Sequence, residues 1–404
     1  MNARGKLLIA LLLCSIVTTG CWDMTEPNRR SLWVGSGMDL LPDGRIKFSA
    51  QILIPAAIGS EGGSKSAQAV VRTGVGASAF DAMHNLQEQL SRDAFVGHRA
   101  VLLVSESMAK HGIQPFVDEF ERNPDSNLRA EVFVVQGESV EDFFKRSEPL
   151  EGFTTKVVKH AAQFSDLNSN AVMLHTFVNT SLSYGHRPFM QVIDVQSHFE
   201  TGEKQSAGSK SGTSAAQPPA SFNVAKIALF NQRDEMVGYL DGEEADNAAW
   251  VAGDLRKTVL TTYVKQGHGT VSLELAKVHR RIRSRVCGRT VTVYITLSGD
   301  AIIRENNSTL NMFLPQDIKC VKQAFDQRTK QLTQQVVTKV QRDYGTDIFG
   351  FGEQIHRHHP YAWRSLKNDW DAQFKLVHTV VDVDLNIHLF GNKGPSAMIR
   401  GRQG

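Results

Sequence analysis

Cys21 is the residue whose surroundings point most directly to a chemical reaction. Arg4 and Lys6 precede an apolar run of eleven residues, 7–17, and Thr18-Thr19-Gly20-Cys21 closes this run. The run is shorter than the roughly 20 residues that cross a bilayer, but it fits the apolar part of a secretory signal. Small residues directly before a Cys match a bacterial lipobox. The sequence therefore predicts cleavage between Gly20 and Cys21 and a diacylglycerol on the Cys21 thiol; an ordinary signal peptide with an incidental Cys21 is the alternative.

A cluster of basic side chains in the second half of the chain is the next group with chemical potential. Its members are Lys277, Arg280, Arg281, Arg283, Arg285 and Arg289. In a membrane-anchored protein, such a cluster could contact anionic headgroups, meet an acidic partner, or form a strand edge that resists aggregation. We favour the strand-edge and acidic-partner interpretations over lipid contact. Nucleic acid is not expected as a partner, because no aromatic residues alternate with the basic ones.

Two patterns resemble metal sites, and both have a simpler explanation. Asp382, Asp384 and Asn386 follow the spacing that begins a calcium loop, but apolar residues alternate with them as in a half-buried strand. His356, His358 and His359 lie together before Pro360, without Cys or acidic residues at ligand spacing. A loop before the next helix accounts for the three His. We therefore expect neither a metal nor another cofactor.

The remaining thiols and the known catalytic motifs give no sign of an enzyme. Cys287 and Cys320 could pair in an exported protein, and two buried thiols are an equal alternative. The sequence contains no nucleophile elbow, P-loop, zinc-protease motif or dinucleotide fingerprint. We therefore predict a protein without catalytic activity.

Length and composition indicate a globular protein of two or three domains. The chain has 404 residues, 41% of them hydrophobic, with 45 Lys and Arg against 42 Asp and Glu. Removal of residues 1–20 would take away Arg4 and Lys6 and leave 45 − 2 = 43 basic against 42 acidic residues. A charge this close to zero argues against nucleic-acid binding by the chain as a whole.

Hydrophobic periodicity predicts an α+β fold with mixed or antiparallel sheets and flanking helices. Hairpins are expected at 32–39 with 46–54 and at 222–230 with 235–240. Further strands are expected at 99–105, 129–135, 258–264, 271–278, 290–297 and 376–389, and helices at 106–111, from 115, at 317–343 and at 361–374, with Phe80, Met83, Leu86 and Leu90 at helical spacing. Residues 201–221 lack large apolar side chains and therefore predict a flexible linker or a long surface loop.

Several short motifs, taken in order, resemble one known family. They are Cys21-Trp22-Asp23, Gly35-Ser36-Gly37-Met38-Asp39, Gly97-His98-Arg99, Ser105-Glu106-Ser107-Met108, and Asp347-Ile348-Phe349-Gly350-Phe351-Gly352, followed by Trp363 and Trp370. Together with the lipobox they resemble the Ger(x)C family, the lipoprotein C subunits of nutrient germinant receptors in spore-forming bacteria. Met24-Thr25 and the 201–221 stretch depart from the family pattern. The resemblance transfers a defined role to Cys21 alone.

The resemblance implies a three-domain lipoprotein on the outer face of the spore inner membrane, acting with an A subunit and a transporter-like B subunit. We expect a signal peptide at 1–20, an N-terminal domain at 21–200, the linker at 201–221, a middle domain at 222–285, a C-terminal domain with the long helix at 286–391, and a polar tail at 392–404. Nutrient specificity and direct nutrient binding stay open. The alternative is a solute-binding lipoprotein of a membrane transporter, although the two predicted hairpins argue against its usual two-lobed architecture.

Overall fold

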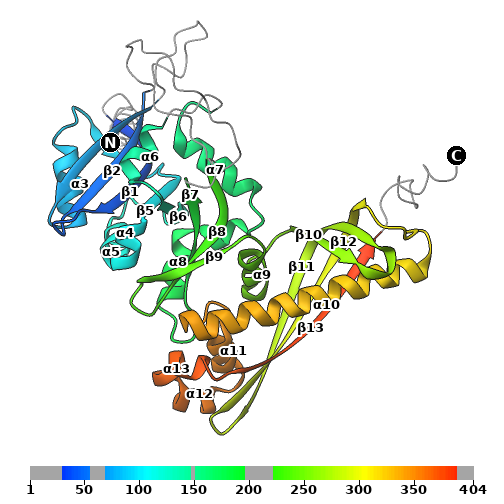
Figure 1. Cartoon of the computed structure of the whole chain (residues 1–404). Helices are drawn as coiled ribbons and strands as arrows, with labels where there is room; N and C mark the ends of the chain where they lie inside the picture. Colours follow the sequence, from blue (N-terminus) through cyan, green and yellow to red (C-terminus); the bar gives the residue numbers. More distant parts are fainter. Residues whose placement is uncertain (1–29, 55–68, 147–150, 196–221, 389–404) are drawn as a thin grey trace, which may run out of the picture.

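The computed structural model describes residues 30–54, 69–146, 151–195 and 222–388. In these residues, strands form a nine-stranded and a four-stranded sheet, with helices packed against both (Figure 1). This arrangement confirms the predicted α+β class. The expected signal peptide, the 201–221 linker and the polar tail lie outside the described residues.

The first sheet has the strand order β3-β2-β1-β5-β6-β7-β8-β9, with β4 paired to β1. Its strands are β1 (Arg30–Leu40), β2 (Ile46–Leu53), β3 (Ala69–Gly76), β4 (Asp93–Phe95), β5 (Val101–Ser105), β6 (Glu131–Gln136), β7 (Phe189–Asp194), β8 (Asn223–Phe230) and β9 (Met236–Asp241). Strands β1, β5, β6 and β7 run parallel, and antiparallel hairpins extend the sheet at both ends. The sheet is therefore mixed, as predicted.

Helices cover both faces of the first sheet because its central strands are apolar on both sides. In β5, Leu102 and Val104 contribute to one core, and Val101 and Leu103 contribute to the core on the opposite face. The first face is covered by α3 (Ala79–Gln87), α4 (Glu106–His111), α5 (Gln114–Arg122) and α8 (Leu174–Ser181), and the second by α6 (Val140–Lys145) and α7 (Thr154–Phe164). Burial on both sides is the usual environment of parallel strands.

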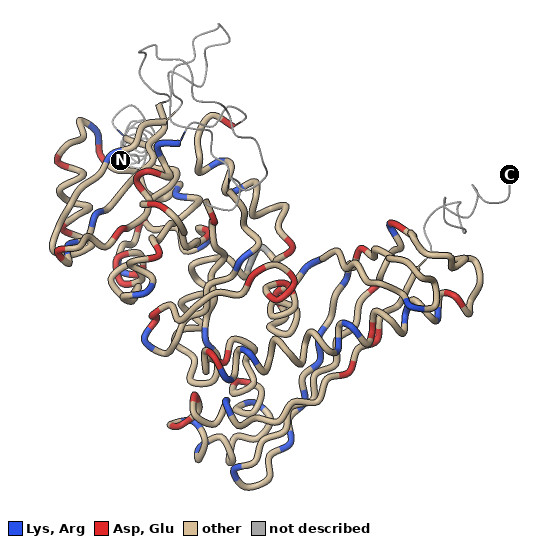
Figure 2. Tube along the Cα trace, in the orientation of Figure 1, with Lys and Arg blue, Asp and Glu red and all other residues tan. Residues whose placement is uncertain are grey.

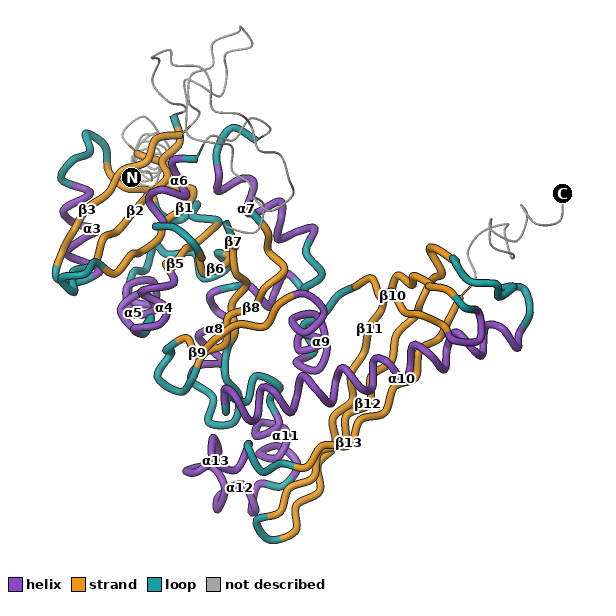
Figure 3. The backbone as a smooth tube through the Cα atoms, in the orientation of Figure 1, coloured by secondary structure: helices purple, strands orange, loops and turns teal. Residues whose placement is uncertain are grey.

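The second sheet is long and narrow and has the order β10-β11-β12-β13. Its strands are β10 (Thr258–Val264), β11 (Gly269–Cys287), β12 (Thr290–Asn306) and β13 (His378–His388). The helices α9 (Gly242–Ala252), α10 (Pro315–Lys339), α11 (Phe351–His358), α12 (Pro360–Leu366) and α13 (Trp370–Phe374) share one hydrophobic core with this sheet (Figure 3). The same core includes Phe189, Ile227 and Leu240 of the first sheet, so apolar packing is continuous between the sheets.

The long helix α10 also protects the free edge of β13. The backbone N–H of Leu385 donates to the carboxylate of Asp326 at 3.0 Å. Lys322 holds this arrangement by pairing with Asp326 at 2.7 Å and with Asp384 at 2.6 Å. This contact occupies one backbone donor of the edge, which makes β13 a poorer template for pairing with another chain.

The helix predictions were confirmed in type but not at every boundary. The 317–343 helix is α10, followed by one π turn at Val340–Tyr344 and by Gly345 with a φ of 65°. The 361–374 helix is interrupted by a 3₁₀ turn at Lys367–Asp369 and so forms α12 and α13. On α3, Leu86 is buried as expected, whereas Phe80 is 73% exposed, because only one side of this short helix contacts the sheet.

The predicted limits of the middle domain do not coincide with the sheets. Strands β8 and β9 join the first sheet by pairing with β7, and a boundary between residues 285 and 286 falls inside β11. Strands β11 and β12 pair from Val271 with Asn306 to Cys287 with Thr290, so they belong to one hairpin. Hydrogen bonding between distant strands decides this grouping. The third domain stays a prediction.

Gly74 is needed where α3 crosses β3. A Cβ atom at this position would lie 2.2 Å from the carbonyl oxygen of Ala82 and 2.5 Å from the backbone nitrogen of Leu86. Both atoms belong to the backbone of α3 and cannot rotate away. We therefore expect Gly74→Ala to lower the free energy of unfolding by about 2 kcal/mol or more.

Gly97→Ala is the matched control, because its added Cβ would find its nearest neighbour at an ordinary 3.5 Å. Urea denaturation of the two variants measures the difference. Equal stability of both variants would contradict the close packing of α3 on β3.

Candidate functional site

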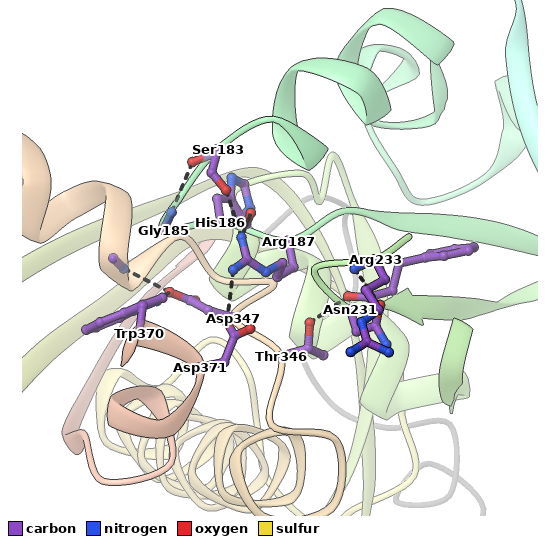
Figure 4. Close-up of polar contacts among 12 residues, drawn as sticks. Ser183, Gly185, His186, Arg187, Asn231, Arg233, Thr346, Asp347, Trp370 and Asp371 are labelled. Carbon is purple, nitrogen blue, oxygen red and sulfur yellow. Dashed lines mark hydrogen bonds and ion pairs between the residues drawn. The ribbon is translucent and has the colours of Figure 1, made fainter. Parts of the chain in front are cut away.

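Arg187 lies at the junction between the two sheets and connects segments far apart in the sequence (Figure 4). Its backbone N–H donates to the carbonyl of Asp347 at 2.8 Å. Its guanidinium donates to the carbonyl of Ser183 at 2.7 Å and pairs with Asp371 at 3.0 Å. The side chain is almost fully buried, so these acceptors replace the water that the charge would otherwise bind. Arg187 therefore fixes the loop before β7 against the segment between α10 and α11.

Asp347 organises the other side of this junction. Its carboxylate, which has no exposed surface, accepts the backbone N–H groups of Phe349, Phe351 and Gly352 at 3.2, 3.1 and 2.8 Å. The indole N–H of Trp370 donates to the same carboxylate at 2.9 Å. Burial raises the pKa of Asp347 to about 6, which still leaves the group ionised at pH 7. One buried charge thus holds the 349–352 turn and α13 together.

Further polar contacts close the junction around this pair. Thr346 donates its hydroxyl to the carbonyl of Phe230 at 2.6 Å, and Tyr344 donates to the carbonyl of Tyr239 at 2.9 Å. His186 contacts the carbonyl of Ile348 at 3.1 Å, and burial lowers its pKa to about 4, so the imidazole is neutral at pH 7. These contacts join β8 and β9 to the segment after α10. All of them are hydrogen bonds to backbone carbonyls, so their role is to hold these segments together.

Backbone also meets backbone directly at the junction. The N–H of Glu353 donates to the carbonyl of Gly185 at 3.0 Å. A Cβ on Gly185 would lie 2.5 Å from the carbonyl carbon of Gly352, so both glycines permit this close approach.

The sequence contained the Asp347–Gly352 motif but gave it no role, and it gave no sign of His186 or Arg187. The high density of glycines around Asp347 was the signal that could have indicated a structural role for this motif.

The basic cluster predicted from the sequence divides into residues with different roles. Arg280 is exposed over much of its surface, but its guanidinium donates to the carbonyls of Val251 and Phe349 at 2.5 and 2.9 Å, so it contributes to the junction. Lys277 occupies a bulge with a φ of 49° and pairs with Asp300 at 3.6 Å. Arg289 pairs with Asp369 at 3.4 Å. The side chains of these three residues therefore all have partners within the folded chain.

Arg281, Arg283 and Arg285 form the rest of that cluster and lie on one exposed face of β11. In the described part of the chain, none of the three side chains has an ion-pair or hydrogen-bond partner. Figure 2 shows blue segments along the lower half of β11, where these residues lie. The cluster thus contains three free cations, fewer than the sequence suggested.

The two metal-like patterns have structural explanations in the fold. Asp382, Asp384 and Asn386 alternate with buried residues along β13, as predicted for a strand. His356 and His358 lie in the last turn of α11, and His359 contacts the carbonyl of Ser284 at 3.0 Å. The loop expected for these His is therefore mostly helix. Over the described ranges, His, Cys, Asp and Glu side chains do not assemble in groups of three or more that could hold a metal ion.

The two cysteines of the folded region are not joined. Cys287 is exposed at the end of β11, Cys320 is partly buried on α10, and both are free thiols. The disulfide alternative is therefore wrong, and the alternative of two buried thiols is wrong as well, because Cys287 is exposed. Cys21 and Gly20, which carry the predicted modification and cleavage, lie outside the described residues.

Known proteins with the same organisation identify the family. Residues 23–195 match the family described as "Spore germination protein N-terminal domain", and residues 225–391 match "Spore germination B3/ GerAC like, C-terminal". The chain belongs to the Ger(x)C spore germination family. The two matches together cover both sheets, except the first two residues of β8, and the junction between them. They favour germination over the solute-binding alternative.

Individual relatives agree with the family assignment over nearly their whole length. Spore germination protein KC of Bacillus subtilis (strain 168) is 20% identical, and the alignment covers 96% of each chain. Spore germination protein B3 of the same organism is 21% identical, over 98% of this chain and 100% of its own. The crystal structure of the GerBC protein superposes with a TM-score of 0.53 at 16% identity, over 87% of this chain and 96% of that chain. The last comparison shows a shared fold.

Asp347→Asn tests whether the junction depends on the buried carboxylate. The substituted amide would turn its NH₂ group toward two of the four N–H donors, which would lose their acceptor. We expect this variant of the Ger(x)C protein to lose about 3 kcal/mol of unfolding free energy.

Asp371→Asn is the control, because Asp371 is 38% exposed and its amide oxygen can still accept from Arg187. Its expected cost is about 1 kcal/mol or less. Thermal unfolding of both variants compares them, and equal losses would show that the junction does not depend on Asp347.

Proposed function

We propose that this Ger(x)C protein is a non-enzymatic, lipid-anchored subunit of a nutrient germinant receptor. The observation that carries the proposal is the family match along the whole folded region, directly preceded by the Gly20-Cys21 lipobox. The mature chain would then be held at the outer face of the spore inner membrane by a diacylglycerol on Cys21. Among the described residues, no helix has the length and apolar character needed to cross a membrane.

The distance along the chain between anchor and fold supports this arrangement. Cys21 precedes Arg30, the first residue of β1, by nine positions. Nine residues span at most about 30 Å when fully extended. The anchor would therefore keep the start of β1 within that distance of the membrane surface, and diacylglycerol, with its two chains, provides stable attachment.

The junction gives this anchoring a consequence for the whole protein. Because Arg187 and Asp347 hold the second sheet against the first, an anchor at one end positions both. Confinement to the membrane raises the effective concentration of a subunit toward membrane-embedded partners, so that modest interfaces suffice for assembly. The proposed partners are the integral-membrane A and B receptor subunits.

Cys21→Ala tests the anchor. Without the thiol, no diacylglycerol can be attached, and we expect the protein to leave the membrane fraction and nutrient-triggered germination to weaken. Cys14→Ala is the matched control, because Cys14 lies inside the predicted signal and would be removed with it. Immunoblots of membrane and soluble fractions, with germination kinetics of the same spores, measure both effects.

Full membrane retention of the Cys21→Ala protein would refute the lipid anchor. If that retained protein also failed to support germination, the germination defect would have a cause other than loss of attachment. A Cys14→Ala protein that also leaves the membrane would point to failed export as the cause of both results.

A further inference from the structure

A bulge in β11 decides which side chains of this strand face solvent. Before the bulge, the odd residues Val271, Leu273 and Leu275 are buried in the core under α10. The pairing register with β12 shifts between Ala276 and His279. Beyond this shift the even residues, such as Ile282 and Val286, pack against the same core. One extra residue therefore turns the odd positions outward, as expected when strand alternation is interrupted once.

The outward positions beyond the bulge form a defined surface, which we call the open face. It consists of Arg281, Arg283 and Arg285 on β11, Tyr294 and Thr296 on β12, and Val380 on β13. Strand pairing brings these residues into rows, with Arg283 opposite Tyr294 and Tyr294 opposite Val380. All of these residues except Arg285 line a shallow cavity of about 880 Å³, and Arg280, Asp382 and Asp384 line it as well. Helix α10 shares the core on the opposite side of the sheet, so it leaves this face uncovered.

The charges on the open face are not balanced within the folded chain. All three arginines are exposed, and no described residue forms an ion pair or hydrogen bond with their side chains. The neighbouring carboxylates lie two strands away, on β13. Thr296 of β12 is paired with Arg281 on one side and with Asp382 on the other. Asp384 forms an ion pair with Lys322. Tyr294 and Val380 are 40% and 48% exposed and add apolar surface beside the cations.

We propose that the open face binds an acidic segment of a partner protein. Side chains at alternate positions of a strand are about 6.6 Å apart, so the three guanidinium groups form a straight row. Carboxylates at alternate positions of an extended segment have the same spacing and can accept paired hydrogen bonds from each guanidinium. The segment would lie along β11 with its apolar side chains against Tyr294 and Val380.

The position of the open face argues for a protein partner over lipid headgroups, an argument that rests on the proposed anchor at Cys21. Strand β1, to which the anchor leads, is in the sheet at the upper left of Figure 1, whereas the lower half of β11 runs to the turn at the bottom. The open face is thus at the end of the molecule remote from the expected membrane contact.

The proposal can be tested in spore membranes with the full-length protein. A photoreactive residue replaces Tyr294 (Tyr294→p-benzoylphenylalanine), and irradiation links it to whatever covers the open face. Mass spectrometry then identifies the linked molecule and segment. Tyr263, which is 56% exposed on β10 at the other end of the sheet, receives the same substitution as a position control.

The arginines are then replaced together in this background. Arg281→Gln, Arg283→Gln and Arg285→Gln should reduce crosslinking to the acidic segment about tenfold or more, because the attraction is electrostatic. Arg92→Gln, Arg233→Gln and Lys265→Gln remove the same charge from exposed, unpaired side chains elsewhere in the described chain and should leave the crosslink unchanged. Lysine at the three positions of the open face should restore much of it.

A crosslink from position 294 to an Asp- and Glu-rich protein segment that disappears with the Gln variant supports the proposal. A lipid adduct alone, no adduct, or an adduct that the Gln variant leaves unchanged would overturn it. Membrane retention of the same samples is scored separately. A protein that detaches therefore argues against the anchor, and one that stays attached without the crosslink argues against the acidic partner.

Discussion

The carboxylate of Asp347 is the group on which the relative placement of the two sheets depends. It has no access to water, and its four donors come from the 349–352 turn and from Trp370. A buried charge is tolerated only when its hydrogen bonds are complete, so these segments have little freedom to move apart. The backbone carbonyl of the same residue accepts from Arg187, which extends this constraint to the first sheet.

This joint explains how a family defined by two sequence segments can act as one body. The N-terminal family match ends at residue 195 and the C-terminal one begins at residue 225, yet β8 and β9 pair with β7 in one sheet. The core that surrounds α9 then connects these strands to β10–β13. A single attachment point near β1 would therefore orient the distant β11–β12 hairpin as well.

The two long sides of the second sheet have opposite roles. One side is buried under α10, and at the free edge of β13 Asp326 accepts from the backbone N–H of Leu385. The other side keeps three unpaired arginines beside a half-exposed Tyr294. Such a surface is soluble by itself but gains ion pairs when an acidic chain covers it, which is the property expected of a subunit that assembles reversibly with others.

Local patterns in the sequence were enough to predict the class of fold, most of the strands, the helix α10 and the strand character of Asp382–Asn386. They also predicted the family, because ordered motifs such as the one at Asp347–Gly352 are local. Two features could not be found this way. The contact between Arg187 and Asp347 joins residues 160 positions apart, and no local pattern in either segment indicates that the two meet.

The second such feature is the bulge at Lys277, which reverses the alternation of β11. From the sequence, all the basic residues from 277 to 289 form one cluster. The tertiary structure directs the Arg280 guanidinium to the carbonyls of Val251 and Phe349, and it leaves Arg281, Arg283 and Arg285 without partners among the described residues. A shift of one residue in strand register exchanges the two faces, and this register is set by pairing with β12 and by packing under α10, which only the folded chain brings together.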